Sequence, residues 1–237
     1  MHNLKMIYNR EMKMFFNTPM AYIFLGVFVI VNGYFFTNLF FVIKQSDLRQ
    51  LFSTISWIYI IFIPAITMGL IAKDNGSGTM EIMSTLPIKN YEYVLGKYFA
   101  ACSLIFVGLL LTVFHYFTLI NVGTNIDHGA ILCGYFGLML VGGLYAAIGI
   151  FFSSLTSNQV IALIASATLS FAFFLIGKIL IFMPSILSQF FQYISIDFHL
   201  TNITRGVIDS RNIIYFGSLI WFFLTMTSQA ISKNRWS

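Results

Sequence analysis

Few residues in this 237-residue chain have the types and spacing that catalysis or metal binding requires. Ser77 in Gly76-Ser77-Gly78 suggests a serine nucleophile, but it lies in a polar loop, and the histidine inside a long apolar segment is His115. A serine–histidine hydrolase is therefore disfavoured. Neither Gly96-Lys97 nor Gly177-Lys178 has the upstream glycine and the following hydroxyl of a phosphate-binding loop, so no motif for hydrolysing ATP is present. No HExxH motif and no cysteine–histidine cluster offers a metal site.

The composition indicates lipid rather than water as the main solvent of the chain. Hydrophobic residues make up 58% and charged residues 9% of the sequence, and the mean hydropathy is +0.84. Soluble domains are about a quarter charged, and a soluble domain of this length could not bury so much apolar surface. The net charge of +5 includes no basic block with interleaved aromatic residues, so a nucleic-acid partner is not expected. Cys102 and Cys133 lie in apolar segments and are expected to be packing residues.

Six intervals without acidic or basic residues approach the roughly 20 residues that a helix needs to cross about 30 Å of hydrocarbon. Their lengths favour helices over the roughly ten-residue alternating strands of a membrane barrel. The fold class predicted is therefore an all-α integral membrane protein, with one transmembrane domain over residues 1–237. The expected transmembrane helices cover about 20–43, 52–72, 98–120, 130–152, 160–182 and 213–231.

The distribution of basic residues predicts the orientation, because cytoplasmic segments carry an excess of Lys and Arg. With both termini in the cytoplasm, eight basic residues lie inside and five outside. The inside set is Lys5, Arg10, Lys13, Lys73, Lys89, Lys97, Lys233 and Arg235, and the outside set is Lys44, Arg49, Lys178, Arg205 and Arg211. An even number of spans agrees with this choice.

The residues before the first span form an amphipathic pattern over about 3–17. Wound as a helix, this segment places Lys5, Arg10 and Lys13 on one side and apolar residues on the other, where Glu11 is an exception. We expect an interfacial helix that turns its basic face toward lipid headgroups and ends at Asn17-Thr18-Pro19. The alternative is a frayed polar tail.

The polar insert between the second and third spans, residues 73–97, is the most highly charged of the expected loops. Its first part, Asp74 to Gly78, is typical of a turn, and a short helix follows until Pro87. One side of that helix carries Met80, Met83 and Leu86, and the other carries Glu81, Ser84 and Thr85. An adaptable methionine face with a single acid indicates a docking surface, although a solvated loop would also satisfy the pattern.

Three further patterns concern the helix bundle. No span has an acidic or basic residue in its middle, which disfavours an ion-coupled carrier. Small residues in the fourth span, such as Gly142 and Ala146, allow helices to approach closely, either within the bundle or between subunits. Pro64 is expected to kink the second span.

The outer loop 184–212 is too polar to span and too aromatic to be free, so short helices on or dipping into the membrane are expected.

The insert "AKDNGSGTMEIMSTLPIKNYEYVLGK" resembles the first cytoplasmic loop of ABC-2 type transporter permeases. The shared pattern consists of Gly78-Thr79, Glu81, Thr85-Leu86-Pro87 and Val94-Leu95-Gly96-Lys97. The segments "SSLTSNQ" and "RGVIDSRNIIYF" also resemble this family. They point to the branch that includes gliding-motility-associated permeases and nitrous-oxide-reductase accessory permeases.

This resemblance implies a type V ABC exporter-like fold in the bacterial inner membrane, working as a homo- or heterodimer. Two separate ABC ATPase subunits would bind ATP and magnesium, and this chain would hold no cofactor and would not itself be an enzyme. The resemblance implies that the interfacial helix and a coupling helix contact the ATPase, and a smaller contact follows the fourth span. The coupling residues would be Thr79, Met80, Glu81, Met83, Thr85 and Leu86, and the smaller contact would include Ser153, Thr156 and Asn158.

The resemblance does not carry a substrate with it. The function expected is therefore a permease subunit for an unidentified substrate, within a gliding-motility-type complex. The alternative is a membrane scaffold that transmits ATPase motion to outer partners without transport.

Overall fold

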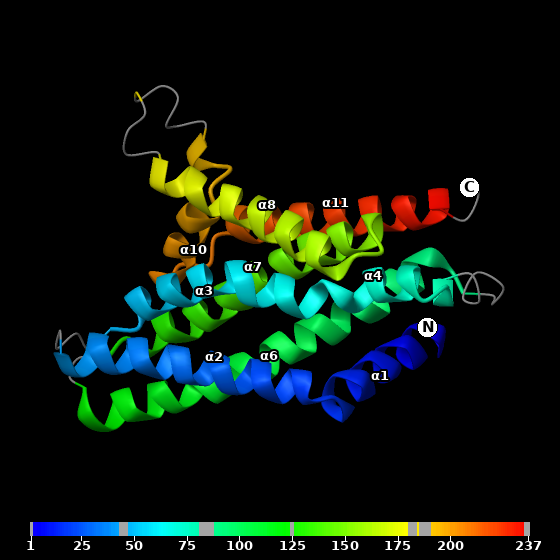
Figure 1. The fold of residues 1–237 in the computed structure, drawn as a ribbon. Helices are drawn as coiled ribbons and strands as arrows, with labels where there is room; N and C mark the ends of the chain where they lie inside the picture. Colours follow the sequence, from blue (N-terminus) through cyan, green and yellow to red (C-terminus); the bar gives the residue numbers. More distant parts are fainter. Residues whose placement is uncertain are drawn as a thin grey trace.

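The computed structural model describes residues 2–42, 47–80, 88–123, 126–179, 184 and 191–234. This part of the chain is helical and holds no β-strand. The helices are α1 (His2–Asn17), α2 (Pro19–Thr37), the π-helical turn η1 (Asn38–Val42), α3 (Arg49–Thr67), α4 (Gly69–Gly76), α6 (Asn90–Val122), α7 (His128–Leu155), α8 (Gln159–Ile179), α10 (Ile196–Thr204) and α11 (Ser210–Asn234) (Figure 1).

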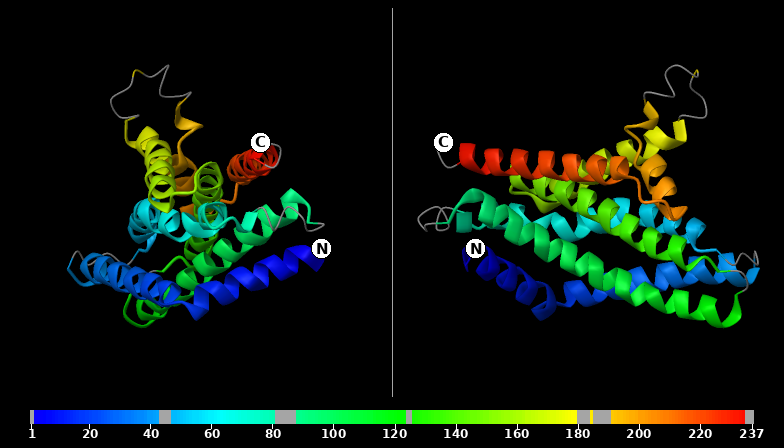
Figure 2. Two further views of the ribbon diagram at one scale, coloured as in Figure 1. Left: turned by 45° about the vertical axis from the view of Figure 1, so that its right-hand side comes forward. Right: turned by 180° about the vertical axis from the view of Figure 1, so that it is seen from behind.

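Six helical segments of the described chain are long and apolar enough to cross a membrane, which confirms the expected fold class. They are Pro19–Val42, Arg49–Gly76, Asn90–Val122, His128–Leu155, Gln159–Ile179 and Ser210–Lys233. Both chain termini lie at the same end of the bundle in Figures 1 and 2, and we call this the terminal end. The other end, which carries α10, is the α10 end.

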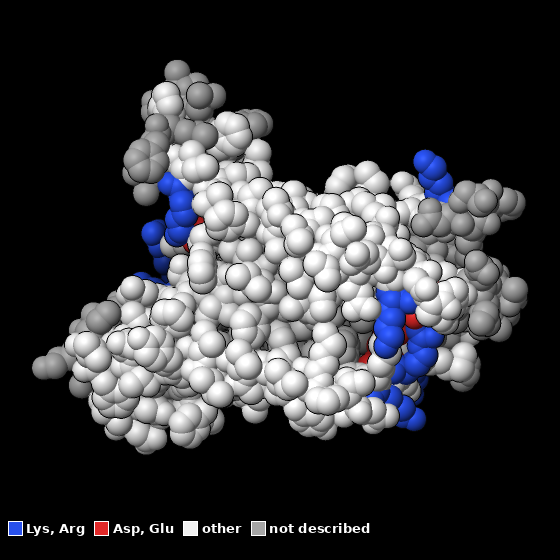
Figure 3. Space-filling model, viewed as in Figure 1, with Lys and Arg blue, Asp and Glu red and all other residues white. Residues whose placement is uncertain are grey.

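Charged residues gather at the two ends of the bundle. On the face drawn in Figure 3, Lys and Arg lie near both ends, and the broad surface between them carries none. An uncharged belt of this kind is what the hydrocarbon core of a bilayer requires, because a charge there lacks water to solvate it.

The longest helix, α6, extends beyond what a bilayer needs. Its 33 residues rise about 50 Å at about 1.5 Å per residue, against about 30 Å of hydrocarbon. It begins at Asn90, eight residues before the expected start of the third span at residue 98. The additional turns lie at the terminal end, where α1 packs against them.

The centre of the bundle is α7, whose best transmembrane window is 72% buried, against 22% for α8 and 17% for α11. Glycines in α7 allow neighbouring helices to pack closely around it. A Cβ on Gly149 would overlap the Thr67 side chain of α3, and a Cβ on Gly134 would overlap the Phe52 ring. Gly142 and Ala146 likewise face the interior of this chain. The small-residue face of the fourth span therefore builds the bundle itself.

The structure describes two segments that were expected to be irregular, the second span near Pro64 and part of the loop 184–212. The second span is interrupted at Met68, between α3 and α4, four residues after Pro64, whose carbonyl accepts the Met68 amide at 2.8 Å. In the loop expected on the outer side, α10 packs against α7 and buries Ile196, Leu200 and Ile203 completely or almost so. It forms part of the hydrophobic core at the α10 end.

Candidate functional site

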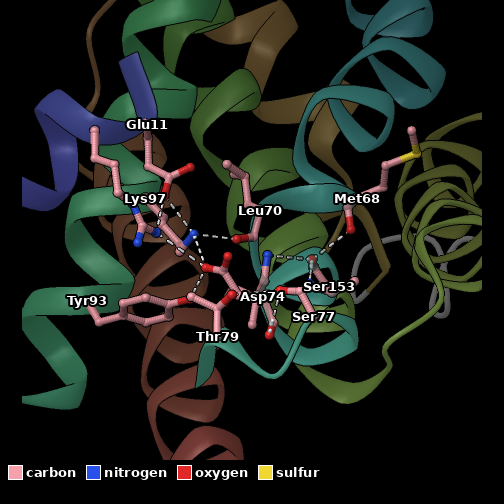
Figure 4. Close-up of polar contacts among 12 residues, drawn as sticks. Glu11, Met68, Leu70, Asp74, Ser77, Thr79, Tyr93, Lys97 and Ser153 are labelled. Atoms are coloured by element: carbon pink, nitrogen blue, oxygen red, sulfur yellow. Dashed lines mark hydrogen bonds and ion pairs between the residues drawn. The ribbon is translucent and has the colours of Figure 1, made fainter. Parts of the chain in front are cut away.

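At the terminal end, five polar side chains from three helices meet in what we call the charge cluster. It consists of Arg10 and Glu11 of α1, Asp74 of α4, and Tyr93 and Lys97 of α6 (Figure 4). These helices are neighbours only in space, because residue 11 and residue 97 are separated by 86 positions. The cluster therefore joins the N-terminal helix to the segment that enters the polar insert.

Lys97 is the centre of the charge cluster. Its Nζ lies 2.8 Å from Glu11 Oε1 and 2.8 Å from Asp74 Oδ2, and it also donates to the carbonyl oxygen of Leu70. An ammonium group has three protons, so three acceptors satisfy it completely. Lys97 and Glu11 are both 0% exposed. Isolated burial of either charge would cost several kcal/mol, and the mutual contacts reduce that cost, although Glu11 Oε2 is buried and has no hydrogen-bond partner among the described residues.

Arg10 lies on the surface side of the charge cluster. Its guanidinium donates to Glu11 Oε1 at 2.6 Å and to Asp74 Oδ2 at 3.3 Å. Burial would lower the pKa of Arg10, but the Glu11 and Asp74 carboxylates outweigh it, so the pKa is raised and the guanidinium stays charged. Two cations and two carboxylates leave the cluster without net charge, which suits a partly buried position.

Asp74 is the point at which all three helices are connected. Its Oδ2 accepts from the Tyr93 hydroxyl at 2.6 Å, besides Lys97 and Arg10. The Lys97 ammonium also lies 4.9 Å from the centre of the Tyr93 ring, a cation–π distance. A displacement of α4 at Asp74 must therefore move α1 and α6 or break these contacts.

A second buried contact connects α4 to the central helix. The Ser153 Oγ of α7 accepts from the amides of Ile71 and Ala72 at 3.0 and 2.9 Å and donates to the carbonyl of Met68 at 2.8 Å. The first amides of a helix have no partner within that helix, and Ser153 satisfies two of them in α4. The Ser153 hydroxyl thus fixes the junction between α3 and α4 to α7.

The turn between α7 and α8 lies beside α4. Asn75 donates through Nδ2 to the carbonyl of Thr156 at 3.3 Å, and a Cβ on Gly76 would meet the Ser157 carbonyl at 3.3 Å. Asn158 begins α8 by accepting the Val160 amide at 2.9 Å. The start of the polar insert therefore lies beside this turn, which is the other segment expected to meet a partner.

The expected site residues divide into three groups. Lys5 and Lys13 are exposed on α1, whereas Arg10 is directed into the charge cluster. Thr79 bonds to the Ser77 hydroxyl at 2.7 Å, directly after Gly78, whose φ of 69° forms the turn. Four of the other coupling residues, Glu81, Met83, Thr85 and Leu86, lie outside the described residues.

Met80 and the three residues of the smaller contact occupy different environments. Met80 is partly buried against the hydrophobic core. Thr156 is half-buried and Asn158 is exposed. Ser153 is 0% exposed, and its hydroxyl is fully used inside the chain, so it is not available to a partner.

The charge cluster was not anticipated, although the sequence contains a signal for it. Glu11 interrupts the apolar side of the N-terminal helix, and an acid in that position requires a cation facing it. Lys97 follows Gly96, where a Cβ would lie 2.8 Å from Cγ2 of Ile7. Glycine at position 96 thus allows α1 to approach α6 closely enough for Glu11 to reach Lys97.

Comparison with known proteins agrees with this architecture. Residues 44–231 match the model of the ABC-2 family transporter protein family, and no curated protein matches the chain. The match includes Asp74, Tyr93, Lys97 and Ser153, while α1 with Arg10 and Glu11 precedes it. Because the matched region covers most of the chain, the protein belongs to the ABC-2 transporter family and is the membrane permease component of an ABC transporter, not its nucleotide-binding component.

Proposed function

We propose that the terminal end faces the cytoplasm of a bacterial inner membrane and binds separate ABC ATPase subunits. The docking surface begins at Thr79 and Met80, continues through the insert to Glu81 and Leu86, and includes the exposed basic residues of α1. ATP and magnesium are held by the ATPase, and the permease works with a second permease subunit, identical or different. The family match supports an ATPase partner, because the membrane component of an ABC transporter works with an ABC ATPase.

The observation that carries this proposal is the position of Lys97 between Asp74 and Glu11. A force applied to the insert reaches Asp74 first, only a few residues from Thr79. Because Lys97 holds Asp74 and Glu11 at 2.8 Å each, α4, α6 and α1 respond as one body. Ser153 passes the same displacement to α7 at the centre of the bundle.

The energetics suit transmission of force. Exposed ion pairs contribute about 0–1 kcal/mol, whereas removing one partner of a buried pair costs about 3–5 kcal/mol. Lys97 and Glu11 belong to the second class, since neither is exposed. A buried junction can therefore carry the closing motion of an ATPase dimer into the membrane without separating first.

Within the family we assign the chain to the gliding-motility-type branch, on the resemblance of "SSLTSNQ" and "RGVIDSRNIIYF" alone. The substrate stays unassigned. In reconstituted vesicles, ATP-driven movement of a candidate substrate supports a transporter, and ATP hydrolysis without movement of any candidate supports a scaffold.

The docking assignment is tested by Glu81→Ala. We expect this variant to insert into the membrane normally but to co-purify with less ATPase and to lose ATP-driven activity. The matched control is Asp47→Ala, which removes a partly exposed acid at the α10 end. If both variants retain equal amounts of ATPase and equal activity, the coupling assignment is wrong.

A further inference from the structure

A lateral cavity of about 710 Å³ opens between α2 and α3 at the terminal end, and we call it the α2–α3 groove. The last turn of α1, the first half of α2, the second half of α3 and the start of α4 form its walls. Ligand sites in proteins typically have about 300–1,000 Å³, so the groove is large enough for a ligand of ordinary size. Its lining is almost entirely apolar, and includes Phe24, Phe62 and Ala65.

The groove exists because the chain turns sharply between α1 and α2. Thr18 is extended, with φ −106° and ψ 153°, and its hydroxyl donates back to the carbonyl of Met14 at 3.0 Å. Pro19 then starts α2 in a new direction, since proline is preorganised for the first position of a helix. The turn separates the beginning of α2 from α3 and leaves the space unfilled.

The groove is open toward the side of the bundle. Ile23 is 63% exposed and Ile61 is 57% exposed, although both line it. Apolar side chains with this exposure on a transmembrane bundle face acyl chains rather than water. A ligand therefore enters from the bilayer and presents an apolar chain to the groove.

A single cation lies at the polar rim of the groove. Lys73 of α4 lines it and is exposed, and within the described residues it forms no ion pair. Among the described residues, none that lines the groove is acidic. The adjacent Asp74 is directed toward Lys97 and Tyr93, and Glu92 bonds to Asn3, so neither neutralises Lys73. An anionic occupant can therefore pair with Lys73 without displacing an acid that the structure describes.

We propose that the α2–α3 groove binds one acyl chain of an anionic phospholipid, whose phosphate pairs with Lys73. An apolar slot with one uncompensated cation at the headgroup level matches that chemistry, and basic sites between transmembrane helices are known to hold anionic headgroups. A helix of a second copy of this chain fits less well, because the acids described at the terminal end are already engaged.

The test uses the 237-residue chain in lipid nanodiscs with equal amounts of phosphatidylglycerol and phosphatidylcholine of identical acyl chains. Native mass spectrometry after mild delipidation reports which lipid stays bound. We expect one phosphatidylglycerol to be retained in preference to phosphatidylcholine, and Lys73→Gln to reduce that preference about fivefold, as expected for the loss of one headgroup-level cation. The control Lys233→Gln removes another exposed cation on α11 and should leave the preference unchanged.

A second variant examines the apolar part of the groove. Ala65→Phe places a ring inside it and should reduce retention of both lipids, whereas Ala172→Phe, on an exposed position of α8, should not. A photoactivatable phosphatidylglycerol with the reactive group on its acyl chain should label α2 and α3 of the unmodified protein. This labelling does not depend on whether Ala65→Phe folds.

Three results would overturn the proposal. The first is an unchanged lipid preference in Lys73→Gln, and the second is acyl-chain labelling confined to helices other than α2 and α3. The third is a change of oligomeric state in Ala65→Phe with no change in bound lipid, which would assign the groove to a second copy. None of these readouts requires an ATPase, so the lipid site can fail while the docking proposal stands.

Discussion

Replacing Lys97 by methionine tests how much the charge cluster contributes to the free energy of unfolding, because it leaves the packing around position 97 nearly unchanged. Methionine keeps most of the volume of the side chain, so the change removes charge and hydrogen bonds without opening a large cavity. Glu11 then loses its 2.8 Å ion pair and stays buried, and the carbonyl of Leu70 loses a donor. Breaking a buried ion pair in this way costs about 3–5 kcal/mol.

Arg10 reduces this cost. Its guanidinium is 2.6 Å from Glu11 and 3.3 Å from Asp74, so both carboxylates retain one cation after Lys97 is removed. Arg10 is nevertheless 42% exposed and lies on the surface side of the cluster, where water weakens the pairing. We therefore expect a loss of about 3 kcal/mol in the free energy of unfolding, at the lower end of the range for buried pairs.

The loss should appear first as detachment of α1. Ile7 is 4% exposed where α1 packs on Gly96, so in a cysteine-free background Ile7→Cys is expected to resist a thiol reagent. Adding Lys97→Met should make it react, while Lys5→Cys on the exposed side reacts in both backgrounds. Unfolding in mixed micelles measures the free energy of both single variants and of the double variant Glu11→Gln/Lys97→Met.

The double-mutant cycle tests whether Glu11 and Lys97 stabilise each other. If Glu11 and Lys97 stabilise each other, the double variant loses less than the sum of the single losses, with a coupling of at least about 1 kcal/mol. Additive losses, or a Lys97→Met loss below about 0.5 kcal/mol with Ile7→Cys still protected, would show that the junction does not hold α1. The proposed transmission of force from the insert to α1 would then have no physical basis.

Three other predictions concern the contact of Ser153 with α4, the glycines and the proposed orientation. Ser153→Ala leaves two amides at the start of α4 without an acceptor, so the free energy of unfolding should fall by about 1–3 kcal/mol; chemical denaturation that finds no change would refute this role. Gly149→Ala drives a methyl group into α3 and should lower the same free energy by about 1–3 kcal/mol. Gly26→Ala, which meets nothing within 4 Å, should be neutral or raise it by up to about 1 kcal/mol, and equal effects of the two variants would contradict the close packing of α7. A cysteine replacing the exposed Ser77 should react with an impermeant reagent only from the cytoplasmic side, and labelling from outside would reverse the proposed orientation.

The transmembrane helices could be predicted because the bilayer imposes a condition that each segment meets separately. A span needs a long run without charge whatever its neighbours are, so the segment expected at 130–152 lies inside α7, His128–Leu155. Packing is different, because it depends on which helices meet. The glycines of the fourth span predicted a close approach, but only the structure shows that Thr67 and Phe52 of α3 occupy the space they leave.

The charge cluster could not be predicted because its members share no local pattern. Periodicity relates residues three or four apart, whereas Glu11 and Lys97 are 86 apart. Lys97 was counted as one of the basic residues that set the orientation, and such residues are usually solvated. The interruption at Met68 was equally hidden: Pro64 predicts a kink, but the bonds from Ser153 that stabilise the break come from another helix.

The separation of Glu11 from Lys97 has a consequence for the biogenesis of the protein. A ribosome adding about 5–20 residues per second takes roughly 4–17 s to make the 86 residues between them. During that interval α1 has emerged without Lys97, and its own Arg10 is the cation beside Glu11, so the carboxylate stays at the aqueous border of the membrane. Docking of α1 becomes favourable only after the helix carrying Lys97 has been inserted with its first turn on the same side. A chain whose third span inserts in the wrong direction leaves Glu11 without Lys97, so α1 loses the buried ion pair that docks it on α6.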